Sequence, residues 1–150
     1  MKNKEVKLYN ILFPLWLVII FPVSWLVIVP GNFIIDSLVL LIAMSAMKIA
    51  HRKEMYKKTI LKVWLFGFIS DFIGAGFLFI AFYVLELPGQ GDDLYLTAPA
   101  TLLAAICIFI FNYLISFKGY DRKTRFKMAL TFAVFTAPYT FLVPMAWIYG

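Results

Sequence analysis

Long apolar stretches separated by short polar segments dominate the chain. A transmembrane helix needs about 20 mostly apolar residues. The stretch 11–50 is about twice that length and contains only two charged residues, Asp36 and Lys48. A proline–glycine–asparagine sequence at 30–32 is typical of a turn. We therefore expect this stretch to form two helices joined by a tight hairpin at 30–32.

Three further apolar stretches follow, and a Gly- and Asp-rich segment at 88–93 separates the first of them from the second. The expected helices cover residues 11–29, 33–50, 63–87, 94–117 and 128–149. The connections are too short to hold a soluble domain. The sequence therefore predicts an all-α integral membrane protein, a single polytopic domain over 1–150 built as a bundle of five transmembrane helices.

Basic residues give the expected orientation of this bundle. All 14 Lys and Arg side chains fall in three segments, at 2–7, 48–62 and 118–127. Five spans place these segments on one side of the membrane, and Lys and Arg are retained on the cytoplasmic side. We therefore expect a cytoplasmic amino terminus and an outer carboxyl terminus.

Composition excludes several protein classes. Hydrophobic residues make up 63% of the chain and charged residues 15%, whereas soluble domains carry about 45–50% and about 25%. A water-soluble domain and a disordered chain are both excluded, and a single cysteine rules out an internal disulfide framework.

Charge and composition also bear on partners and location. The net charge of +6 is explained by membrane orientation, so no nucleic-acid partner is expected. The expected partner is the lipid bilayer, and the Lys-, Ile- and Phe-rich composition favours a bacterial cytoplasmic membrane. The sequence leaves open whether the chain forms homo-oligomers or joins a larger membrane complex.

Asp71 is the clearest candidate for a functional site, because an ionised carboxylate inside a bilayer is costly. One interpretation is a protonated, hydrogen-bonded structural residue, and the other is a binding site for a proton or cation. Counting residues from the inner helix ends places Ser45, Asn112 and Thr136 near the same depth as Asp71. These polar side chains either support such a site or form ordinary hydrogen bonds between helices.

The acidic residues near the outer side form a second set of candidates. Asp36 is expected in the first turn of the second helix and Glu86 at the end of the third, and no Lys or Arg lies on that side. Such a surface attracts cations, although a helix dipole alone also favours Asp36 at a helix start. Asp36 and Asp71 are expected at different depths, which argues against a protease-like carboxylate pair.

Recognisable catalytic chemistry is absent from the sequence. It contains no zinc-protease, nucleophile-elbow, Cys-x-x-Cys or phosphate-loop motif, and one His and one Cys make a poor metal site. We therefore expect no enzyme activity and no cofactor. The remaining enzyme hypothesis, activity on lipid at the basic side, would involve four residues: His51, Arg52, Arg122 and Arg125.

The leading hypothesis is a small transporter or channel-like protein for a cation, a proton or a small cationic or amphipathic molecule. Asp71 would be the central site, and Pro138 between Thr136 and Thr140 favours a broken helix of the kind that binds ions in some transporters. The alternative is a non-catalytic membrane subunit that packs against a larger membrane partner. Small residues around Asp71, at Ser70 and Gly74, suit close helix packing in either case.

Overall fold

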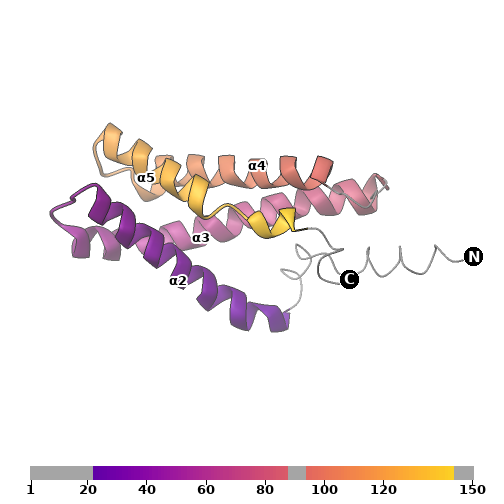
Figure 1. Ribbon diagram of the computed structural model, residues 1–150, viewed down its shortest axis with the longest axis horizontal. Helices are drawn as coiled ribbons and strands as arrows, with labels where there is room; N and C mark the ends of the chain where they lie inside the picture. Colours follow the sequence, from indigo (N-terminus) through magenta and orange to yellow (C-terminus); the bar gives the residue numbers. More distant parts are fainter. Residues whose placement is uncertain (1–21, 88–93, 144–150) are drawn as a thin grey trace, which may run out of the picture.

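A computed structural model describes residues 22–87 and 94–143, which are helical apart from short connections (Figure 1). Its main elements are the helices α2 (Pro22–Ala46), α3 (Arg52–Phe79), α4 (Leu94–Phe111) and α5 (Arg122–Phe135). Shorter elements extend them: the π-helical turns η2 (Ile80–Val84) and η3 (Asn112–Ser116), and the 3-10 turn η4 (Tyr139–Leu142).

Three helical segments in the described residues are long and apolar enough to cross a membrane: Pro22–Ala46, Arg52–Val84 and Leu94–Ser116. Their outer surfaces carry large apolar side chains, among which Leu26 is 79% exposed and Leu61 63% exposed. A continuous surface of this kind suits lipid rather than water. Over the described residues, the expectation of an all-helical chain with helices able to span a membrane is confirmed.

Helix α2 contradicts the hairpin expected at 30–32, because it continues through Pro30 without a break. A turn inside a bilayer would expose unpaired backbone groups to lipid, whereas a helix that contains proline loses only one hydrogen bond. Near this point the indole Nε1 of Trp64 donates a hydrogen bond to the carbonyl of Val29 at 3.3 Å. The expected helices 11–29 and 33–50 are therefore wrong as separate elements over 22–46, while residues 11–21 lie outside the described residues.

Helix α5 also differs from the expected helix at 128–149. It begins earlier, at Arg122, because the Asp121 carboxylate accepts a hydrogen bond from the Thr124 N–H and caps the first turn. It ends at Phe135, shortly before Pro138, since the residue before a proline is disfavoured in helical geometry. Residues 144–149 of the expected helix lie outside the described part of the chain.

The other two expected helices agree more closely with the structure. α4 together with η3 covers Leu94–Ser116, close to the expected 94–117. α3 begins at Arg52 rather than at 63, because the basic segment is itself helical. Within that segment Glu54 and Lys58 form a salt bridge of 2.6 Å, one helical turn apart.

Helix α3 packs against both α2 and α4, and α5 packs against α4 and α2 (Figure 1). Buried apolar side chains form two clusters. The first joins all four helices and includes Leu40, Val63 and Phe132. The second joins α3, α4 and η4 and includes Leu78 and Phe141. Between them α3 carries four small or polar residues, Gly67, Ser70, Asp71 and Gly74, among larger apolar ones.

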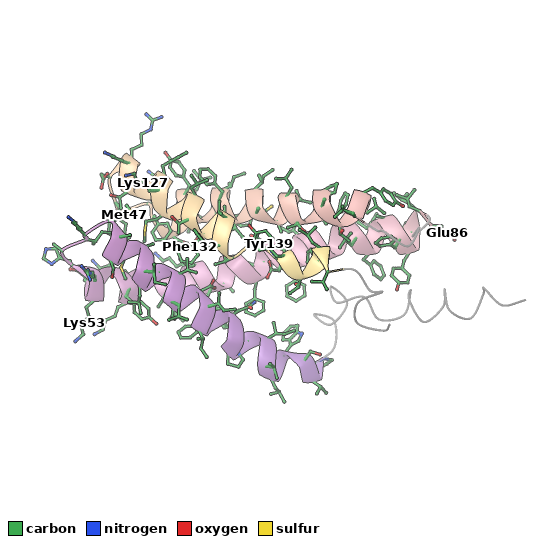
Figure 2. All side chains as sticks on the ribbon, viewed as in Figure 1. Met47, Lys53, Glu86, Lys127, Phe132 and Tyr139 are labelled. Atoms are coloured by element: carbon green, nitrogen blue, oxygen red, sulfur yellow. The ribbon has the colours of Figure 1, made fainter. Side chains whose placement is uncertain are left out.

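The charged ends of the bundle are separated along its length. Lys53 and Lys127 lie at one end of the molecule and Glu86 lies at the other (Figure 2). We call the end that carries Lys53 and Lys127 the basic end. The basic segments 48–62 and 118–127 thus share one end, as the sequence analysis expected for these two.

Candidate functional site

A cavity of about 390 Å³ lies between α2, α3 and the chain that follows α5. We call it the carboxylate cavity, because both Asp36 and Asp71 line it. The remaining lining residues are Ile28, Asn32, Ile35, Gly67, Phe68, Phe135, Thr136, Ala137, Pro138, Tyr139, Thr140 and Phe141. The cavity therefore combines three separate segments of the chain.

Asp36 reaches the cavity from the middle of α2, where its side chain is only 5% exposed. A β-carbon at Gly67 would lie 3.6 Å from the Asp36 Oδ2 atom, so the carboxylate lies directly over the surface of α3. Asp71 lies one helical turn beyond Gly67 on the same face of α3. The two carboxylates therefore line the same space between α2 and α3.

Because Asp36 and Asp71 line the same cavity, the expectation that they lie at different depths is wrong. That expectation depended on the hairpin at 30–32, which would have placed Asp36 in the first turn of a helix at the outer side. Because α2 is continuous, Asp36 lies well inside the helix and faces α3.

No basic side chain lines the carboxylate cavity. Across the described residues the single ion pair is Lys58–Glu54, which lies at the basic end. The Asp71 Oδ1 atom is buried and has no hydrogen-bond partner among the protein atoms. An unpaired carboxylate in apolar surroundings is costly, so the arrangement needs a proton, a cation or water to complete it.

The break after α5 supplies further oxygen atoms. The Thr136 hydroxyl donates to the carbonyl of Phe132 at 2.8 Å, and the Tyr139 hydroxyl donates to the carbonyl of Val134. Both hydroxyl oxygens keep lone pairs for another partner. The carboxyl end of α5 also carries a partial negative charge. The helix end and the two carboxylates together favour a positive charge in the cavity.

The other three candidates from the sequence lie elsewhere. Ser45 lies at the basic end, where its hydroxyl accepts a hydrogen bond from Arg52 Nη1 at 3.2 Å. Glu86 is exposed at the opposite end (Figure 2). Asn112 is fully buried in η3 and is not part of the cavity wall. Of the six candidates, the structure brings Asp36, Asp71 and Thr136 together.

Asn32 is a cavity residue that the sequence analysis missed. It was assigned to a turn, although it lies four residues before Asp36 and thus on the same face of a continuous helix. Tyr139 was not singled out either, and Thr140 was named only as a flank of the break at Pro138. Their signal was the neighbouring Pro138, which marks the break.

The oxygen atoms of the cavity suit a proton or a hard cation rather than a transition metal. Within 22–87 and 94–143, no group of three or more His, Cys, Asp and Glu side chains could hold a metal ion. No family model, curated protein or solved structure matches the chain. The function therefore has to be argued from the site itself.

Proposed function

We propose that this protein is a small membrane transporter or channel-like protein for a proton or a small cation, and that Asp36 and Asp71 form its binding site. The observation that carries this proposal is the shared cavity. Carboxylates from two different helices face one space between apolar clusters, and no basic side chain balances them. Carboxylates inside membrane helices mark ion or proton pathways more often than structural sites.

Charge balance sets the expected mechanism. Two uncompensated negative charges are unfavourable at this depth, so the empty cavity holds protons on its carboxylates. A monovalent cation that binds between the carboxylates then displaces a proton. The hydroxyl groups of Thr136 and Tyr139 complete the oxygen ligands, and the negative end of α5 favours the bound charge.

The basic end is proposed to face the cytoplasm of a bacterial cell. It carries the Lys- and Arg-rich segments 48–62 and 118–127, and such segments are retained on that side. Cysteines introduced in place of Lys53 and Glu86, in a Cys107→Ser background, test this orientation. An impermeant thiol reagent added to intact cells should label the Glu86→Cys variant and spare Lys53→Cys, and the reverse pattern contradicts the orientation.

Flux measurements in liposomes test the transport proposal. We expect Asp36→Asn and Asp71→Asn each to abolish uptake of the cation that wild-type protein carries, followed together with internal pH. Asp121→Asn is the matched control, because it removes an exposed carboxylate outside the cavity and keeps a residue that caps helices well. Unchanged flux of every tested cation in Asp71→Asn would refute the proposed role.

The alternative, an accessory subunit of a larger membrane complex, is motivated by the small size of the chain, the lack of any strong motif and the small-residue faces of its helices. At Gly74 the small-residue face of α3 is filled from within the chain, by Ala100, Ala104 and Phe141. The close packing that suggested another protein is therefore used internally at this position. At this position the small residues therefore give no support to the subunit.

A further inference from the structure

A second cavity lies at the basic end of the molecule and has a volume of about 720 Å³. We call it the basic-end cavity. Its wall includes Thr59 and Lys62 from α3, Ser116 from η3 and Lys118 from the segment before α5. Along α3 the wall of this cavity ends at Lys62, and the wall of the carboxylate cavity begins at Gly67. At 1.5 Å per residue, this leaves a gap of about 8 Å between the two walls along the axis of α3.

Asn112 lies beside this gap. The stacked rings of Phe66 and Phe111, 5.3 Å apart, place the start of η3 level with Phe66 on α3. η3 packs against both α3 and α5, and Asn112 is fully buried. Asn112 therefore lies at the depth of the gap, between the basic-end cavity and the carboxylates.

The buried polar atoms without a partner follow the same line. Across the described residues, the buried side-chain nitrogen and oxygen atoms that lack a hydrogen-bond partner belong to three residues, Asp71, Asn112 and Ser116. Both amide atoms of Asn112 are in this state. Buried polar groups in proteins are almost always paired, with protein atoms or with water. One such group lines each cavity and Asn112 lies at the depth between them, an arrangement that suits an internal path for water.

The π turn η3 changes the surroundings of the Ser116 hydroxyl. Ser and Thr hydroxyls elsewhere in the bundle, such as those of Ser70 and Thr101, donate to the carbonyl four residues earlier. At η3 the carbonyl four residues before Ser116 is that of Asn112, which accepts the N–H of Phe117, and the Ser116 hydroxyl has no protein partner. This hydroxyl is therefore available to water at the wall of the basic-end cavity. Such π turns occur frequently at functional sites.

We propose that Ser116, Asn112 and Asp71 form a hydrated route by which the carboxylate pair exchanges protons or small cations with the solution at the basic end. Asn112 holds water in the middle of the route, because its amide can donate and accept hydrogen bonds at the same time. This inference rests on the proposed function. The water access that it requires can be measured separately from transport.

Cysteine accessibility tests the route directly. In a Cys107→Ser background, Ser116→Cys and Asn112→Cys are treated with a small water-soluble methanethiosulfonate reagent. The reagent is added to the solution on the side of the membrane that the basic end faces. Leu78→Cys is the control, because Leu78 is equally buried but belongs to the second apolar cluster. We expect Ser116→Cys to react fastest and Asn112→Cys to react at least tenfold faster than Leu78→Cys. Equal rates at positions 112 and 78 overturn the route, even if Asp71 proves essential for flux.

A substitution at Asn112 then separates the route from the site. We expect Asn112→Leu to slow cation flux at least tenfold while the carboxylate pair still binds the cation at equilibrium. Binding is read from protection of Asp71 against a hydrophobic carbodiimide, which modifies protonated carboxyl groups. Ser70→Ala is the control, since the Ser70 hydroxyl is already bonded to the Phe66 carbonyl.

If Asn112→Leu transports at the wild-type rate, Asn112 is not part of the route. If the wild-type protein transports nothing while Asn112→Cys still reacts, the proposed function fails and the water path stands.

Discussion

At Gly74, α3 packs tightly against α4 and η4, and this contact allows a quantitative prediction. A β-carbon there would lie 2.9 Å from Phe141 Cε2, 3.1 Å from the carbonyl oxygen of Ala100 and 3.2 Å from the β-carbon of Ala104. Favourable contacts between carbon atoms begin at about 3.5 Å. The Ala100 carbonyl is fixed in α4, and Phe141 is only 4% exposed, so neither can move away freely.

We expect Gly74→Ala to lower the free energy of unfolding by about 1–3 kcal/mol, the usual cost of inserting one carbon into a packed core. Gly76→Ala is the matched control on the same helix, because a β-carbon there meets nothing within 4 Å. The control should raise stability by at most about 1 kcal/mol, which is the difference in helix propensity between alanine and glycine.

Titration with SDS from mixed micelles, followed by tryptophan fluorescence, measures both variants under the same conditions. Adding Phe141→Leu to Gly74→Ala should recover part of the loss, because the shortest contact is with the Phe141 ring. Equal stability of Gly74→Ala and Gly76→Ala would refute the packing of η4 and α4 on α3 described above.

Three further predictions concern single residues. The Arg125 guanidinium donates to the Tyr113 carbonyl at 2.8 and 3.1 Å and stacks over the Tyr113 ring. Arg125→Gln should therefore lower the same SDS-unfolding free energy by about 1.5–3 kcal/mol, and a change below about 0.5 kcal/mol contradicts this. Asn112→Leu should leave that free energy unchanged or raise it, because no hydrogen bond between protein groups is lost, and a loss above about 1 kcal/mol would reveal a partner. Hydrogen bonds from Thr124 hold the pKa of Asp121 below its ordinary value of 3.8, so the stability that Asp121 contributes is present above pH 3.8 and is lost as the pH falls through the lowered pKa. Thermal melts of wild type and Asp121→Ala should therefore differ at neutral pH and converge in acid, and a constant difference argues against the cap.

The sequence predicts a helix well where the length of an apolar stretch alone sets the ends of that helix. The bounds of α4 with η3 follow from one uncharged stretch between two polar segments. The rule fails at α2, because proline and glycine end helices in water but are tolerated inside membranes, where backbone groups have no water to bond with. It also fails at the start of α3, because a helix can extend beyond the apolar residues that cross the bilayer.

The wrong hairpin at 30–32 also led to a wrong prediction for the candidate site. Asp71 and Thr136 were found by depth and by the nearby proline, and both line the carboxylate cavity. Asp36 was assigned to the outer side only because a hairpin was placed six residues before it. With α2 continuous, Asn32 and Asp36 fall on one face toward α3, and the cavity becomes visible. The depth of a charged residue therefore depends on helix continuity, which the local sequence did not reveal.

The position of Asp36 in α2 also has a consequence for how the protein enters the membrane during synthesis. An aspartate near the centre of a lone helix opposes insertion by about 3 kcal/mol. Asp36 becomes shielded only when α3 covers it at Gly67, and α3 follows after the short turn at 47–51. The insertion machinery should therefore release α2 and α3 to the lipid together, as a preformed helical pair. A chain truncated before α3 should leave α2 poorly inserted, and Asp36→Leu should restore its insertion.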